Sequence, residues 1–429
     1  MVKISRINTI IFVVMFIGFV LSAKMMALFH LKITGFEYVM WFVFTAFLAL
    51  INIKFFVRNI SVKKTYFILL LFLALFCFLN YFFASVPLIR YVQGAFFSFL
   101  FAANFILFYN LRIEKRDFYL VADLIIYFLA TIAVLAYLER IFISGHYTSF
   151  FLRGVSTLLK DAGMAATLLN INIILCLGMF MIRRKYRYLL LAAFSFITIC
   201  LLLFMKAVAA SLIIFSFFTI ICFDGRTRRR ILYVSGIVLV LLLVILGKPF
   251  VSQIQYKYKL YFGSHSEQTP RIALYIAGFK IAWDHFPFGS GQGTFGSYPV
   301  GKHYSPVYYK YNLHNVYGLG PDAVRSKKEN FLFDTYWSHI IGEMGFIAAF
   351  LYIWLWFFPA IKSLKYLSSA SGEKKSMAFI ITLTIITIFV ESFALSIPEQ
   401  LQFIMMYAGL GAIAFRLMLQ DMQIQKSLS

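Results

Sequence analysis

Long apolar runs recur along the whole 429-residue chain, of which 62% is hydrophobic and only 13% charged. Many of these runs approach about 20 residues, the length that an α-helix needs to cross a bilayer core of about 30 Å. Lipid cannot pair with backbone polar groups, so a crossing segment must be a helix or part of a closed barrel. The apolar residues are continuous rather than alternating, which favours helices. The sequence therefore predicts an all-α, polytopic membrane helix bundle that forms one integral membrane domain over residues 1–429.

About twelve transmembrane helices are expected, with boundaries uncertain by a few residues. The first run is long and lacks a small-x-small cleavage site, so we interpret it as a retained span rather than a signal peptide. The two expected spans at 188–205 and 207–223 are separated only by Lys206. The expected spans are 7–29, 36–53, 65–86, 92–110, 118–139, 164–182, 188–205, 207–223, 231–247, 337–359, 377–397 and 401–419.

Lysine and arginine are shared unevenly between the two sets of short connections. One set, which includes both termini, holds 23 of the 40 cations, many of them in the runs at 183–187 and 226–230. The opposite set of short connections holds seven. Positively charged short loops remain in the cytoplasm, so we expect cytoplasmic N- and C-termini and an external loop between the ninth and tenth spans.

That large loop covers residues 248–336 and carries ten Lys/Arg against five Asp/Glu. Within it, apolar residues at helical spacing between Thr269 and Phe286 predict a short amphipathic helix on the membrane face, with Thr269 as its N-cap and Pro270 in its first turn. A glycine-rich turn follows, in which Gly289, Gly291 and Gly293 permit close approach of the backbone to a ligand. The excess of cations predicts an anionic substrate and membrane-lipid contacts.

Several functional classes lack support in the sequence. The four cysteines lie within or at the ends of apolar runs and show no zinc spacing or disulfide framework. We find no glycine-rich phosphate loop, HExxH or GxSxG pattern, so we expect no metal and no cofactor. Nucleic acid is excluded as an expected partner because no basic soluble domain is present to hold it.

Short patterns in and around the loop resemble the O-antigen polymerase and ligase family, which comprises the Wzy-type polymerases and related ligases. Arg271 opens the amphipathic helix, and P-x-G-x-G-x-G-x-F follows at 287–295. The next span starts with DTYWSHIIGEMG, which ends in E-x-G at Glu343. Earlier, Lys206 stands where the family often has arginine, and the segment at 151–163, with Arg153, looks like the external loop that the family places before a span.

One departure separates the two branches of the family. The ligases carry a histidine, usually followed by asparagine, nine residues before the E-x-G glutamate. Asp334 and Thr335 occupy those positions here. A His-Asn pair does occur at 314–315, but the residues after it do not match. The resemblance therefore favours a polymerase over a ligase.

The resemblance implies a GT-C-related fold that transfers glycan between undecaprenyl pyrophosphate carriers at the periplasmic face of a bacterial inner membrane. Cations would stabilise the departing pyrophosphate, and arginine contacts phosphate with two donors. The expected pyrophosphate ligands are Arg271, Lys206 and Arg153. An acid or imidazole would take the acceptor proton, so the catalytic candidates are Asp334, His339 and Glu343, the last most simply orienting a cation.

Two alternatives stay open. An O-antigen ligase would pass the glycan to lipid A core instead of to another carrier-linked unit. A polytopic transporter or flippase would also suit twelve spans, although the large loop and the absence of visible two-fold repetition speak against it. A chain-length regulator is a further partner that the resemblance implies. The sequence does not separate O-antigen from capsule or another surface glycan.

Overall fold

The computed structural model describes residues 4–28, 36–53, 64–84, 86–142, 162–202, 205–223, 225–230, 233, 236, 269–325, 330–369, 372–393 and 399–428. Within those residues the chain is helical and contains no strand, which confirms the predicted all-α class. The ninth predicted span and the loop up to residue 268 lie almost wholly outside the described residues, and so does Arg153.

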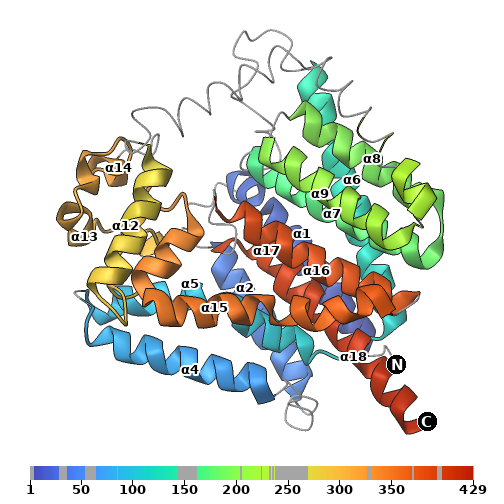
Figure 1. Cartoon of the computed structure of the whole chain (residues 1–429), viewed down its shortest axis with the longest axis horizontal. Coiled ribbons are helices and arrows are strands. Elements are labelled where there is room, and N and C mark those ends of the chain that lie inside the picture. The colour runs from blue at the N-terminus through green and yellow to red at the C-terminus, as the bar shows by residue number, and fades with distance from the viewer. Residues whose placement is uncertain are drawn as a thin grey trace.

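Most of the described helices begin and end close to the predicted spans (Figure 1). They are α1 (Ile4–Leu28), α2 (Phe36–Ile51), α4 (Lys64–Tyr81), α5 (Leu88–Tyr109), α6 (Lys115–Phe142), α7 (Ala162–Arg183), α8 (Tyr186–Leu201), α9 (Met205–Cys222), α12 (Pro270–Asp284), α13 (Pro306–Lys310), α14 (Asp322–Arg325), α15 (Tyr336–Ser369), α16 (Glu373–Glu391), α17 (Leu401–Ile404) and α18 (Gly411–Leu428). Shorter turns are η3 (Tyr298–Gly301), η4 (Leu313–Asn315) and the π-helical η6 (Met405–Leu410).

Six segments of the described chain are long and apolar enough to cross a membrane, which supports the predicted membrane character. Four further apolar helices, in α2, α4, α8 and α9, are shorter. The total of about twelve spans and the side on which each end lies stay predictions. The six segments are Ile4–Ser22, Leu88–Tyr109, Lys115–Leu135, Gly163–Arg183, Tyr336–Ser368 and Leu401–Gln420.

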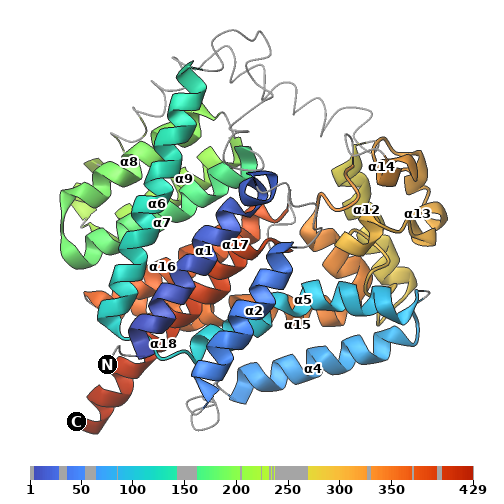
Figure 2. The same cartoon turned by 180° about the vertical axis from the view of Figure 1, so that it is seen from behind.

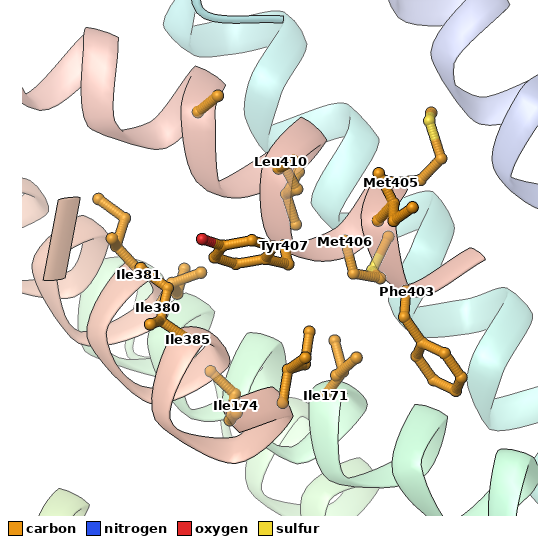
Figure 3. Packing of buried hydrophobic residues seen from close by; sticks show 14 of the residues in the cluster. Ile171, Ile174, Ile380, Ile381, Ile385, Phe403, Met405, Met406, Tyr407 and Leu410 are labelled. Atoms are coloured by element: carbon orange, nitrogen blue, oxygen red, sulfur yellow. The ribbon is translucent and has the colours of Figure 1, made fainter. Parts of the chain in front are cut away.

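The main core forms where α7 and α16 pack against the continuous helix built from α17, η6 and α18. Figure 3 shows isoleucines of α7 and α16 facing Tyr407 of η6. Tyr407 stacks on Trp356 of α15 at 4.1 Å between ring centroids, and its hydroxyl donates to the Trp356 carbonyl oxygen at 3.1 Å. A wide aromatic ring with a hydrogen-bonded hydroxyl fills the space at the π-helical turn.

The helices α12, α13 and α14 lie together at one end of the molecule, and both chain termini lie toward the opposite end (Figure 1). Figure 2 shows α4 and α5 reaching toward the α12–α14 end. The described part of the large loop has its own small hydrophobic cluster, which includes Leu274, Phe295, Tyr308 and Leu332. This described part of the loop is therefore folded rather than extended, and α12 packs along α15.

The long helix α15 is broken at Gly345, where φ is +75° and ψ is 170°. This backbone conformation lies in a region that residues with a side chain rarely adopt. The break exposes the carbonyl oxygens of Gly342 and Glu343, which accept hydrogen bonds from the backbone nitrogens of Ser290 and Gly291, each at 3.0 Å. The E-x-G pattern thus marks the point where the loop docks onto the span.

Candidate functional site

The helix α12 begins as the sequence predicts. Thr269 is its extended N-cap residue and Pro270 is the first helical residue, where a missing N–H costs nothing. One face, with Ala277 and Gly278, is buried against α15. The other face exposes a row of large apolar side chains, namely Ile276, Phe279, Trp283 and then Phe286 beyond the helix end. This leaves an exposed apolar stripe one to four turns from Arg271, and the position of the helix on a membrane face stays a prediction.

We call residues 285–297 the glycine loop. Its three predicted glycines have positive φ angles of 74°, 101° and 79° at Gly289, Gly291 and Gly293. A Cβ added at Gly289 would lie 2.4 Å from the backbone nitrogen of Gly345, and one at Gly293 would lie 2.7 Å from the Arg90 carbonyl oxygen. Gly289 and Gly293 approach protein backbone and Gly291 approaches Ala84, so the visible role of these glycines is to seat the loop against α15, α5 and the turn after α4.

Arg271 and Asp334 form an ion pair, which we call the outer pair. The Nε and Nη2 atoms of Arg271 both lie 2.7 Å from the same Oδ2 oxygen of Asp334. The side chains keep 35% and 21% of their surface exposed, so a polar substrate can reach both. The predicted pyrophosphate ligand and the predicted base are therefore partners, and an arriving phosphate would compete with Asp334 for the guanidinium.

Glu343, unlike the outer pair, is fully buried. Its Oε1 accepts hydrogen bonds from the Phe295 backbone nitrogen at 2.7 Å and from the Ser297 hydroxyl at 2.6 Å. Among the described residues, its second carboxylate oxygen has no hydrogen-bond partner. These contacts show that the carboxylate holds the end of the glycine loop, and the expectation that Glu343 orients a cation stays a prediction.

His339 is also buried and faces a residue that the sequence did not single out, Glu399. The His339 Nε2 atom lies 3.7 Å from Glu399 Oε1, and the imidazole packs edge-on against Tyr336 with 4.8 Å between ring centroids. Burial, together with the nearby charge of Glu343, raises the pKa of Glu399 to about 8. We call His339, Glu343 and Glu399 the inner cluster.

The glycine loop closes the inner cluster off from solvent. A Cβ at Gly296 would lie 2.6 Å from the Cβ of His339, so the loop backbone rests directly on the histidine. His339 is 1% exposed and Glu343 0%. In this arrangement only the outer pair is accessible, and an acceptor hydroxyl can meet His339 only if the loop moves.

Lys206 lies at the start of α9, close enough to Glu391 for a Coulombic attraction. Glu391 also accepts a hydrogen bond from Asn170 Nδ2 at 3.0 Å and another from the Thr167 hydroxyl. The end of α16 that carries Glu391 also meets α12, because the Tyr275 hydroxyl donates to the Phe393 carbonyl oxygen at 3.0 Å. Lys206 therefore lies near an acid beside the candidate site.

Sequence reasoning missed Glu399 and Asn80. Glu399 had one available signal, since it is an acid in the short connection between two apolar runs. Asn80 is a polar residue near the end of an apolar run, and its side-chain nitrogen donates to the Glu343 carbonyl oxygen at 3.1 Å. Neither signal identifies a partner, because both contacts join segments far apart in the chain.

A comparison of the sequence with protein-family models and with curated proteins finds no match. The resemblance to a family described above thus remains an expectation that depends on the residues themselves. Chemically, the site offers an accessible guanidinium, a carboxylate bound to it, and an enclosed acid–histidine cluster beneath a tightly seated loop. Such a set suits the binding of an anionic group and the handling of a proton.

Proposed function

We propose that the protein is a membrane glycosyltransferase of the O-antigen polymerase type. It transfers a growing glycan from undecaprenyl pyrophosphate to the sugar of an incoming carrier-linked repeat unit, at the periplasmic face of a bacterial inner membrane. The observation that carries the proposal is the accessible Arg271 at the start of α12, whose guanidinium forms an ion pair with Asp334. Charge develops on the departing pyrophosphate, and a preorganised guanidinium stabilises it.

The surroundings of Arg271 suit a lipid-linked substrate. Ile276, Phe279 and Trp283 are more than half exposed and extend away from Arg271 along α12. An aromatic and aliphatic face of this kind suits the acyl boundary of a membrane. A carrier could therefore place its diphosphate at Arg271 and its polyprenyl tail along the same helix.

The test measures chain growth by purified protein in liposomes supplied with carrier-linked repeat units. Arg271→Ala should lower the rate by about 10²–10³-fold, the typical cost of removing one preorganised donor to a developing anion. Arg271→Lys should recover only part of the rate, because an ammonium cannot reproduce the planar two-donor contact. Lys280→Ala is the matched control, since it removes an exposed cation from the same helix.

Three outcomes would redirect the proposal. Unchanged chain growth in Arg271→Ala would remove this residue from the site. Transfer to lipid A core, without growth on a second carrier-linked unit, would identify a ligase. Movement of the carrier-linked unit across the bilayer without any new glycosidic bond would identify a transporter.

A further inference from the structure

A cavity of about 440 Å³ lies between α1, α6 and α7, away from the residues of the candidate site. It forms where α1 and α6 begin and α7 ends. Three arginines and two aspartates line it, together with Thr9 and two apolar residues. The full lining is Arg6, Thr9, Ile10, Arg116, Asp117, Leu120, Asp123 and Arg183.

The two aspartates are already engaged by protein groups. Asp123 accepts hydrogen bonds from Arg183 Nη1 at 2.5 Å and from the Tyr188 hydroxyl at 2.8 Å. Asp117 is buried in the first turn of α6 and accepts a hydrogen bond from the Ser5 hydroxyl. Arg183 therefore balances Asp123, and an acid in a first helical turn is stabilised by the helix dipole.

Arg6 and Arg116 are differently placed. Both side chains are exposed, and neither forms an ion pair within the described part of the chain. Arg6 of α1 and Arg116 of α6 line the cavity from different helices, so an anion bound in the cavity has an arginine available on either side. Arginine is well suited to this because its planar donors match the oxygens of a phosphate.

The edge of the cavity carries exposed apolar side chains. Ile10 is 59% exposed and Leu120 is 49% exposed, and the exposed Val14 and Leu124 continue the same faces one turn further along α1 and α6. A free phosphate gains nothing from contact with these apolar side chains. A phospholipid can contact both the arginines, through its headgroup, and the exposed apolar faces of α1 and α6, through its acyl chains.

We propose that this cavity binds an anionic phospholipid, with the headgroup phosphate between Arg6 and Arg116 and the acyl chains against Ile10 and Leu120. The predicted orientation places this end of the bundle at the cytoplasmic leaflet, where anionic lipids attract basic residues and fill basic pockets between helices. The proposal does not depend on the proposed glycosyl transfer, since it uses the other end of the molecule.

The experiment measures lipid retention by native mass spectrometry of detergent-solubilised protein, with dioleoylphosphatidylglycerol or dioleoylphosphatidylcholine added. We expect wild type to retain the anionic lipid preferentially. The double variant Arg6→Ala/Arg116→Ala should bind it about tenfold more weakly, the effect of losing one or two charge-assisted contacts. The matched control is Arg226→Ala/Arg229→Ala, which removes two exposed arginines outside the cavity and should leave retention unchanged.

Two further measurements control for folding and distinguish a lipid headgroup from free phosphate. Arg6→Lys/Arg116→Lys keeps the charge and guards against a folding defect, so it should retain more lipid than the alanine variant. Inorganic phosphate, compared with chloride at the same ionic strength, should not displace the lipid. Equal binding of both lipids, unchanged retention in the alanine variant, or displacement by inorganic phosphate would each overturn the proposal.

Discussion

Three residues of the outer pair and the inner cluster lie close together in sequence but differ in their access to solvent. Asp334, His339 and Glu343 fall within ten residues of one another at the start of α15. Asp334 is accessible and bound to a guanidinium, whereas His339 and Glu343 are enclosed by the glycine loop. The same short motif thus supplies one group that can meet a substrate and two that hold the structure around it.

Because of this difference in access, variants of the two groups should affect different properties of the protein, namely its activity and its stability. Solvent-exposed ion pairs contribute about 0–1 kcal/mol to folding. The outer pair keeps part of its surface exposed, so it should stabilise the fold less than an enclosed carboxylate does. A buried carboxylate with two hydrogen bonds is different, because its removal leaves enclosed donors without partners. Variants of the outer pair should therefore change the rate of chain growth, and variants of the inner cluster should change the free energy of unfolding.

The largest effect on stability is expected for Glu343→Ala. The change leaves the Phe295 nitrogen and the Ser297 hydroxyl without an acceptor in a closed site, and it opens a cavity. The free energy of unfolding should fall by about 2–5 kcal/mol. Glu343→Gln keeps an oxygen acceptor and should lose less. Thermal unfolding in detergent measures both, with Asp334→Ala as the exposed control, and equal losses in Glu343→Ala and Asp334→Ala would contradict the comparison.

The second effect is a pH dependence that Glu399 imposes on stability. Its pKa is about 4.5 in the unfolded chain and about 8 in the folded protein. Between these values the folded protein holds a proton that the unfolded chain has lost. The stabilising contribution is therefore complete below pH 4.5 and disappears as the pH rises through 8. The free energy of unfolding should fall by up to about 1.4 kcal/mol per pH unit in this window.

Unfolding measured from pH 5 to 9 tests this dependence. Glu399→Gln should make the curve less steep than that of wild type, whereas Glu114→Gln, which alters an exposed acid, should keep the wild-type slope. A Glu399→Gln curve as steep as wild type would assign the dependence to another group. The ionisable residues that face Glu399 or feel its charge are His339, Glu343, Tyr38, Tyr336 and Tyr352.

These results also show which parts could be predicted from sequence. The apolar runs predict most of the long helices, because continuous apolar residues leave few alternatives in lipid. Thr269 and Pro270 predict the start of α12, since capping depends only on local residues. The ion pair between Arg271 and Asp334 spans 63 residues, so no local pattern identifies it. Each residue could be assigned to the site, but their partnership is set by the packing of α12 on α15.

The break at Gly345 was missed for a related reason. Its E-x-G pattern was recognised, but the positive φ angle and the docking of the glycine loop depend on contacts with residues 287–289. Glu399 was missed because its burial requires α2, α15 and α17 to meet, as the hydrogen bond from the Tyr38 hydroxyl to its backbone oxygen shows. Burial, rather than residue type, distinguishes the inner cluster from the outer pair.

A third prediction asks whether Asp334 acts through Arg271. Asp334→Ala should slow chain growth by about tenfold to a hundredfold, because an unheld guanidinium samples unproductive positions. In an Arg271→Ala background the same change should have almost no further effect, which a double-mutant cycle measures directly. Asp334→Asn keeps an oxygen acceptor and should lie between wild type and alanine. A further loss of about 10²–10⁴-fold in the Arg271→Ala background would instead identify Asp334 as a general base.

The smallest effect on stability is expected for a change at Lys206, which belongs to neither the outer pair nor the inner cluster. The residue is partly exposed, and its charge lies near the buried carboxylate of Glu391. Lys206→Met should lower the free energy of unfolding by about 1 kcal/mol, because it removes one charge–charge attraction between a partly exposed lysine and Glu391. Adding Glu391→Gln should restore stability, since the uncompensated charge is then removed. Thermal unfolding and chain growth are measured on the same three proteins. If the double variant recovers both, Lys206 serves Glu391; a stable but inactive double variant would instead place Lys206 beside Arg271 as a second contact to the pyrophosphate.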